Sequence, residues 1–117
     1  MIKIERVLIP VDGSDSSRNA AKYAAHLVGH RGAKLYLLHV WEPVNMTIGG
    51  DKAEKLRERA QAKAMEMLEE YRRMLEPCGL EMELIARSGR PDYVILNAQE
   101  ELGCDLIVIG SRGLSVL

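Results

Sequence analysis

The chain lacks most features that would place it in a membrane or outside the cell. Its 117 residues include only two cysteines, Cys78 and Cys104, which are far apart and form no Cys-x-x-Cys pair. This spacing predicts reduced thiols rather than a redox or metal motif. The longest apolar runs, at 7–11 and 106–109, are far shorter than the roughly twenty residues of a membrane span. With no secretory leader either, we expect a cytoplasmic protein that makes no membrane contact.

The chain also has no excess of charge of either sign. Its formal net charge is −1, although 28% of its residues are charged. A general nucleic-acid binder needs a dominant basic field, so we expect no nucleic-acid partner. The three histidines, His26, His30 and His39, have no nearby cysteines or acids that would complete a zinc site. We therefore expect no metal bound directly by the protein.

A regular alternation of short and long segments indicates the fold class. At 117 residues and 47% apolar content, the chain fits a single domain over residues 1–117. Strands are predicted at Ile4–Val11, Lys34–Val40, Leu80–Arg87 and Asp105–Ile109. Helices are predicted at Ser16–His30, Asp51–Glu76 and Pro91–Leu102. This β-α alternation predicts an α/β fold, a parallel sheet with helices on both faces.

Residue patterns inside these segments predict how deeply each one is buried. The first and second strands are almost continuously apolar, which is typical of strands covered on both faces. The third alternates apolar and polar residues, so we expect it at the outside of the sheet. Either Ser14 or Asp15 can cap the first helix. The second helix has one apolar stripe, predicted to comprise Leu56, Ala60, Ala64, Met67, Tyr71 and Leu75.

The residues best suited to ligand chemistry follow the strands at their carboxyl ends. Asp12 follows the first strand, Val40 ends the second, and Gly110 and Gly113 follow the fourth. Ligands of such sheets bind outside these ends, where the strand order reverses. A carboxylate there can accept hydrogen bonds from ribose hydroxyls. Backbone N–H groups of a Gly-x-x-Gly turn can point at phosphate oxygens. Backbone groups after a strand end can meet a purine edge.

The sequence lacks the motifs that characterise several classes of enzyme. No glycine loop ends in Lys-Ser or Lys-Thr, which disfavours a P-loop kinase or ATPase. No Gly-x-Ser-x-Gly elbow is present. The first strand is not followed by the Gly-x-Gly-x-x-Gly of a dehydrogenase. The run Gly13–Ser16 only partly matches the pyrophosphate loop of adenylating enzymes. A receiver domain needs an aspartate at the end of its third strand, where this chain has Ile85-Ala86-Arg87.

Four segments, in order and spacing along the whole chain, resemble the universal stress protein family. They are Val-Asp-Gly-Ser from Val11, Leu-Leu-His-Val ending at Val40, Gly-Arg-Pro ending at Pro91, and Asp-Leu-Ile-Val-Ile-Gly-Ser-Arg-Gly ending at Gly113. The resemblance implies a Rossmann-like fold, similar to adenine nucleotide alpha hydrolases, with five strands usually ordered 3-2-1-4-5. It also implies a homodimer. One branch of the family binds ATP through Gly-x2-Gly-x9-Gly-Ser/Thr and the aspartate after the first strand.

The same resemblance implies a set of nucleotide-binding residues. Asp12 would contact the nucleoside, and the Val40 backbone would meet adenine. Gly110 and Gly113 would open the phosphate loop, where Arg112 could pair with phosphate. Pro10 and Val11, which precede the aspartate, complete the predicted site. The loop from Trp41 to Gly50 could cover the adenine.

The chain departs from the family pattern after Gly113. The second Gly-Ser/Thr would fall beyond Leu117, and the usual fifth strand is absent. We therefore expect a C-terminally incomplete domain with strand order 3-2-1-4, in a truncated or a naturally short chain. The missing segment could weaken the hold on the triphosphate.

We expect a universal stress protein-like ATP-binding protein with a regulatory or stress-response role. ATP could arrive with Mg or Mn, and we expect at most slow ATP hydrolysis. The alternative is a dimeric interaction module of the same family that binds no nucleotide. An adenine nucleotide and a second copy of the chain are thus the predicted partners.

Overall fold

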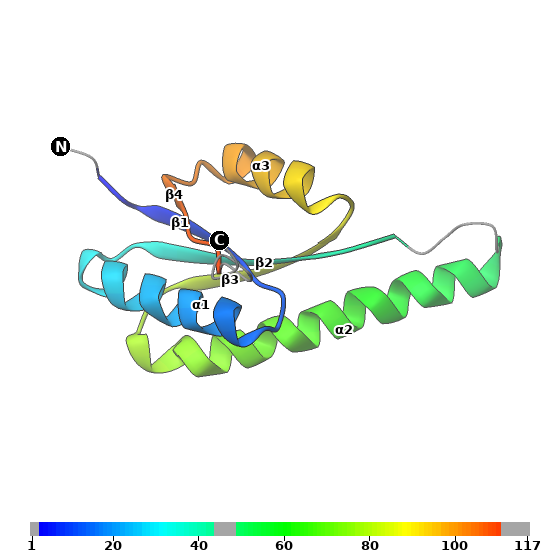
Figure 1. The fold of residues 1–117 in the computed structure, drawn as a ribbon, viewed down its shortest axis with the longest axis horizontal. Coiled ribbons are helices and arrows are strands. Elements are labelled where there is room, and N and C mark those ends of the chain that lie inside the picture. The colour runs from blue at the N-terminus through cyan, green and yellow to red at the C-terminus, as the bar shows by residue number, and fades with distance from the viewer. Residues whose placement is uncertain (1–2, 44–48, 111–117) are drawn as a thin grey trace, which may run out of the picture.

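The computed structural model describes residues 3–43 and 49–110. It forms three layers, a parallel sheet between two layers of helices (Figure 1). The strands are β1 (Arg6–Pro10), β2 (Lys34–Trp41), β3 (Met82–Ser88) and β4 (Leu106–Ile107). The helices are α1 (Asp15–Val28), α2 (Asp51–Leu75) and α3 (Pro91–Leu102), with short 3₁₀ turns at Gly29–Arg31 and Glu76–Cys78.

The sheet has the order β3-β2-β1-β4, and each neighbouring pair is parallel. This order confirms the sequence-based expectation for the described residues. The chain first moves outward from β1 through β2 to β3. It then crosses back, so that β4 pairs with the other side of β1. The strand order therefore reverses between β1 and β4.

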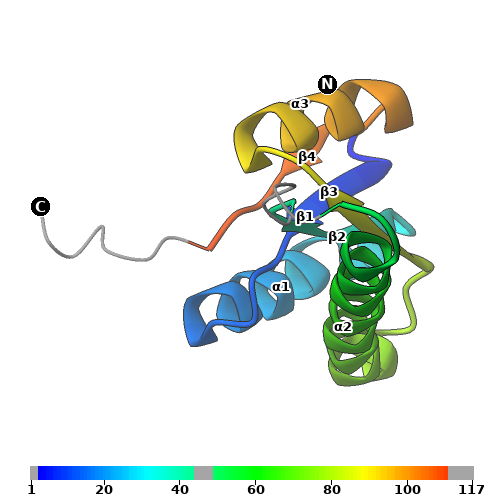
Figure 2. The same ribbon diagram turned by 90° about the vertical axis from the view of Figure 1, so that its right-hand side faces the viewer.

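The helices cover both faces of the sheet, as predicted. Figure 2 shows α1 and α2 on one face and α3 on the other. The α1–α2 side buries the larger cluster, with Val7 and Ile9 of β1 and Leu35 and Leu37 of β2. The α3 side buries a smaller cluster that includes Leu8, Tyr36 and Leu38. Alternate residues of β1 and β2 thus enter different cores, which explains why both strands are apolar almost throughout.

The outer strands are shorter or more exposed than the inner ones. β3 lies at one edge and has no fully buried residue, which confirms its predicted outer position. The predicted fourth strand, Asp105–Ile109, is paired only at Leu106 and Ile107. The first strand is likewise shorter than predicted. The pairing of β4 with β1 stops after Ile107 because Pro10 has no N–H to extend it.

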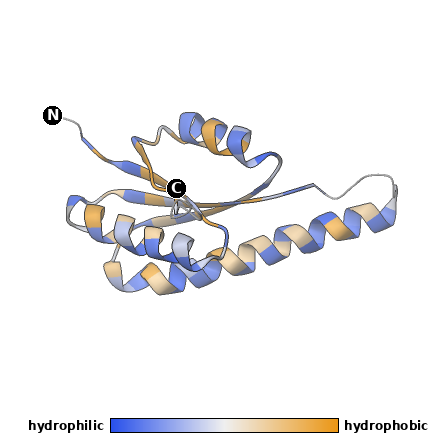
Figure 3. Ribbon diagram, viewed as in Figure 1, coloured by the Kyte–Doolittle hydropathy of each residue, from blue (hydrophilic) through white to orange (hydrophobic). Residues whose placement is uncertain are grey.

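Helix α2 is amphipathic, but its buried stripe differs from the predicted one. Figure 3 shows hydrophilic and hydrophobic bands alternating along it. Ala64, Tyr71 and Leu75 are buried as predicted, whereas Leu56 is 36% exposed and Ala60 and Met67 are only half-buried. The buried set is Ala53, Ala64, Leu68, Tyr71 and Leu75. The first turns of α2 extend past the ends of the strands (Figure 1), and Leu56 stays partly exposed there although Ala53 is buried.

Across residues 3–43 and 49–110, no helix combines the length and the apolar character needed to cross a membrane. The long helix α2 fails this test because of its many charged residues.

Candidate functional site

A crevice opens between β1 and β4 at their carboxyl ends, where the strand order reverses. Leu8 pairs with Ile107, and the Val108 N–H donates to the Leu8 carbonyl at 3.0 Å. In a parallel ladder the next bond would run from the amide of residue 10 to the Val108 carbonyl. Pro10 cannot donate it. On its other side β1 stays paired with β2, because the Val11 N–H donates to the Leu38 carbonyl at 2.8 Å.

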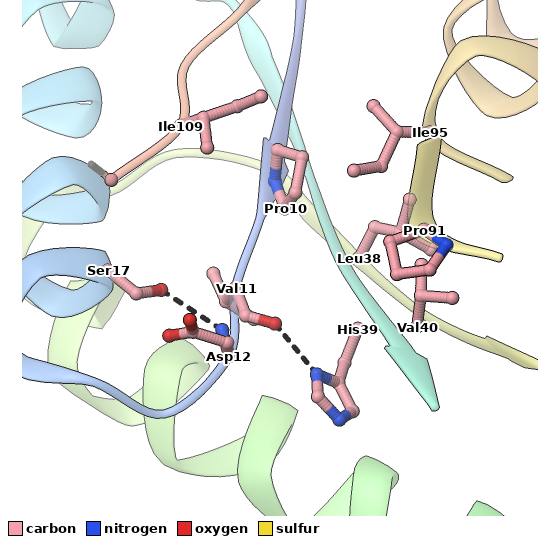
Figure 4. Close-up of a pocket in the computed structure, with 11 residues that line it drawn as sticks. Pro10, Val11, Asp12, Ser17, Leu38, His39, Val40, Pro91, Ile95 and Ile109 are labelled. Atoms are coloured by element: carbon pink, nitrogen blue, oxygen red, sulfur yellow. Dashed lines mark hydrogen bonds between the residues drawn. The ribbon is translucent and has the colours of Figure 1, made fainter. Parts of the chain in front are cut away.

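A pocket of about 250 Å³ occupies this crevice. Figure 4 shows Ile109 and Pro10 on one side and residues of β2 and α3 opposite them. Its walls are mostly apolar, and its polar groups come from Asp12, Ser17 and His39. The lining residues are Pro10, Val11, Asp12, Ser17, Leu38, His39, Val40, Pro91, Ile95, Ile109 and Gly110. Mostly apolar walls with a few polar groups are typical of a site for a small organic molecule.

Local hydrogen bonds shape the loop between β1 and α1. Ser14 is the N-cap of α1, and its hydroxyl accepts the Ser17 N–H at 3.1 Å. The Ser14 N–H in turn donates to Asp12 Oδ1 at 2.9 Å. Gly13 has φ +83°, a conformation that favours glycine. The Asp12 carboxylate is thereby held at the beginning of α1, on the Ser17 side of the loop (Figure 4), and Asp12 is one of the residues that line the pocket.

His39 contacts the same loop from β2. Its Nδ1 lies 2.7 Å from the Val11 carbonyl oxygen. A carbonyl oxygen can only accept, so Nδ1 carries the proton and donates it. The ring therefore fixes the orientation of the peptide bond that joins Val11 to Asp12.

Gly110 lies where the end of β4 approaches the first turn of α1. A Cβ at this position would lie 2.6 Å from the Ser16 carbonyl oxygen and 2.8 Å from Ser17 Cα. Both atoms belong to the backbone, so only glycine fits without a shift of the chain. This close packing fixes the position of the chain where it leaves β4 and borders the pocket.

Five of the predicted site residues line this one pocket: Pro10, Val11, Asp12, Val40 and Gly110. The predicted Arg112 and Gly113 lie outside the described residues, as do residues 44–48 of the Trp41–Gly50 loop. Trp41 itself extends β2, and its indole N–H donates to Gln61 of α2. It therefore contacts α2 and is not among the residues that line the pocket.

Sequence reasoning missed six residues of the lining. Three are neighbours of predicted residues, Leu38 and His39 before Val40 and Ile109 before Gly110. Ser17 carried a signal, because a hydroxyl in the first turn of α1 can bond the preceding loop. Pro91 and Ile95 carried none, since only the fold brings the start of α3 to the crevice.

Within the described ranges, no group of three or more His, Cys, Asp or Glu side chains could hold a metal ion. Cys78 is exposed and Cys104 is buried, and they are not joined to each other. Burial raises the pKa of the Cys104 thiol, and the nearby Asp105 carboxylate adds to the effect.

The fold and the crevice define a doubly wound, Rossmann-like α/β protein with a pocket at the switch point, where ligands of such folds bind. The chain matches the family model described as "Universal stress protein family" over residues 3–117. It therefore belongs to the universal stress protein family.

Curated relatives agree with this assignment. The chain is 31% identical to Universal stress protein YxiE of Bacillus subtilis, over 96% of this chain and 82% of that protein. It is 34% identical to a universal stress protein of Thermus aquaticus, over 95% of this chain and 80% of that one.

Solved structures with the same fold include two with bound nucleotides. One is a universal stress protein family protein from Arabidopsis thaliana with AMP bound. It has a TM-score of 0.71 and 24% identity, over 95% of this chain and 79% of that chain. Another is a universal stress protein in complex with cAMP. Its TM-score is 0.71 and its identity 21%, over 91% of this chain and 72% of that chain.

Proposed function

We propose that this chain binds an adenine nucleotide, with ATP as its main ligand, and acts in the regulation of a stress response. The observation that carries the proposal is the convergence of Pro10, Val11, Asp12, Val40 and Gly110 on one pocket. They come from three strand ends that are far apart in sequence. The AMP and cAMP complexes of proteins with this fold make an adenine nucleotide the first ligand to test.

Each part of the pocket has a distinct task in this proposal. The adenine ring packs between the apolar side chains that line the crevice, and the Val40 backbone meets its edge. The Asp12 carboxylate accepts hydrogen bonds from the ribose hydroxyls. At about 250 Å³, the pocket lies near the lower end of small-molecule sites, which suits the nucleoside half of the ligand.

The phosphates extend from this pocket past Gly110. Gly110 lines the pocket, and its backbone N–H is the proposed first contact to the phosphates. Arg112 and Gly113 follow directly in the sequence and are proposed phosphate contacts. A Mg or Mn ion would be held mainly by phosphate oxygens and water.

The proposal includes three further properties. The chain has no strong enzymatic activity, with at most slow ATP hydrolysis. It acts in the cytoplasm. It self-associates as a homodimer, since β4 is an edge strand of the described sheet and the nearby Ile109 side chain is 57% exposed.

Calorimetric titration with Mg-ATP and AMP tests the nucleotide site. The parent chain is expected to bind ATP at micromolar concentrations, and Asp12→Ala to weaken binding at least tenfold. The matched control is Asp15→Ala, an exposed carboxylate three residues along the chain that pairs with Arg18. This control is expected to bind as tightly as the parent.

The other outcomes are equally informative. Equal affinity for ATP and AMP would mean that the nucleoside half supplies the binding energy. If the titrations detect no binding of either nucleotide, the proposal is wrong. The alternative, a dimeric module that binds no nucleotide, would then be favoured if light scattering shows a nucleotide-independent dimer.

A further inference from the structure

The loop that carries Asp12 is tied to a helix that lines no part of the pocket. Tyr71 belongs to α2, is only 1% exposed, and reaches the loop with its hydroxyl. The Gly13 N–H donates to this hydroxyl oxygen at 3.0 Å. The hydroxyl donates in turn to Ser17 Oγ at 2.9 Å. One tyrosine thus joins the loop to the first turn of α1.

Ser17 continues this connection into the site. It is 3% exposed, and its Oγ also accepts the Asp12 N–H at 3.2 Å. Two successive backbone amides, those of Asp12 and Gly13, therefore donate to two buried hydroxyls that bond each other. Both amides flank the carboxylate that is proposed to contact ribose.

The two backbone amides limit how the protons of this group can be arranged. Backbone amides can only donate, so both hydroxyl oxygens accept from the loop. The Tyr71 hydroxyl then has its own proton left, and it donates this proton to Ser17. Removing the Tyr71 hydroxyl would deprive the Gly13 N–H of its acceptor and Ser17 of a donor.

We propose that Tyr71 is a positioning residue for the nucleotide site, acting through Ser17 and the Gly13 amide to hold Asp12 in its binding orientation. This inference rests on the proposed function. Tyr71 touches no ligand in this scheme. Its hydroxyl restricts the loop before binding, so that less order has to be imposed when the nucleotide enters.

Tyr71→Phe removes one oxygen and keeps the ring in the core. Calorimetric titration of this variant is expected to show roughly three- to tenfold weaker ATP binding than the parent. The matched control is Tyr36→Phe, which removes the hydroxyl of another buried tyrosine, on the α3 side of the sheet. It is expected to leave ATP affinity unchanged.

A second control separates positioning from loss of stability. Leu75→Ala also changes a buried α2 residue, but Leu75 belongs to the last turn of the helix. It is expected to lower the midpoint of urea unfolding more than Tyr71→Phe does, while ATP affinity stays at the parent value. If the ATP affinities of Tyr71→Phe, Tyr36→Phe and Leu75→Ala instead fall in proportion to their urea unfolding midpoints, the positioning role is wrong.

A readout without ligand completes the test. In the nucleotide-free protein, Tyr71→Phe is expected to move the amide proton resonance of Gly13, and Tyr36→Phe is expected to leave it in place. If the parent binds ATP and Tyr71→Phe binds it equally well, the inference alone fails. If the parent binds no nucleotide, the proposed function fails and the inference fails with it.

Discussion

Asp105 shows how one side chain joins the two ends of the described chain. Its Oδ2 accepts the N–H of Glu5 at 2.7 Å and the N–H of Arg6 at 3.0 Å. The Asp105 N–H donates to the Arg6 carbonyl at 2.8 Å. These contacts align the start of β4 with the start of β1, at the sheet end opposite the crevice. The Glu5 N–H, followed by that of Arg6, lowers the pKa of the Asp105 carboxyl below its usual value.

This lowered pKa predicts a pH dependence of stability. The pKa of an aspartate in an unfolded chain is about 3.9. The pKa of Asp105 in the folded chain is lower. The carboxylate therefore stabilises the fold above about pH 4, and this contribution is lost as the pH falls through the folded pKa. The difference in unfolding free energy between the parent and Asp105→Asn is expected to shrink from pH 6 to pH 3, measured by urea unfolding. A difference that is equal at both pH values would contradict this account.

Among the elements, β1 has the most consequential boundary, because Pro10 ends its pairing with β4 but not with β2. The variant Pro10→Val restores an N–H and keeps an apolar side chain. It is expected to extend the ladder to the Val108 carbonyl, narrow the crevice and weaken ATP binding severalfold. Calorimetry measures the binding, and the amide resonance of residue 10 reports the new hydrogen bond. An unchanged ATP affinity with the new bond formed would show that the crevice does not depend on Pro10.

Most elements could be predicted from the sequence because their start and stop signals are local. The third helix was predicted at its observed bounds, since Pro91 begins it and Gly103 ends it. The second helix was predicted to end at Glu76, one residue beyond its observed end at Leu75. The buried stripe of α2 was less predictable, because a helical pattern does not reveal that the first turns extend past the sheet. The length of β4 depends on the partner strand and on Pro10.

The site could be predicted only as far as strand order allows. Asp12 and Gly110 follow strands and Val40 lies near the end of one, so parallel pairing alone brings them to one edge of the sheet. Tyr71 reaches the same loop from 58 residues away along the chain. Its position in an apolar stripe predicted burial, and nothing in that pattern indicated a hydrogen-bonding partner. Such contacts depend on how α1 and α2 pack together.

At the scale of the whole molecule, nucleotide binding is expected to raise the free energy of unfolding. A ligand that binds only the folded chain raises the free energy of unfolding by about 2.7 kcal/mol when it is present at 100 times its dissociation constant. Urea unfolding with and without Mg-ATP is expected to show an increase of this size for the parent chain. Asp12→Ala at the same nucleotide concentration is expected to show little or none. An equal increase in both would mean that ATP binds elsewhere on the fold.

The position of β4 also determines the order in which a growing chain can become functional. Strands β1, β2 and β3 are neighbours in sequence as well as in the sheet, so they can pair while synthesis continues. The strand that pairs with β1 across the switch point comes about a hundred residues later, as the contact between Glu5 and Asp105 shows. A nascent chain can thus bury its larger core first, and the crevice gains its second wall only when Ile109 and Gly110 have been added. The proposed nucleotide site thus needs residues from both ends of the described chain, and only a chain that includes residues 109 and 110 can complete it.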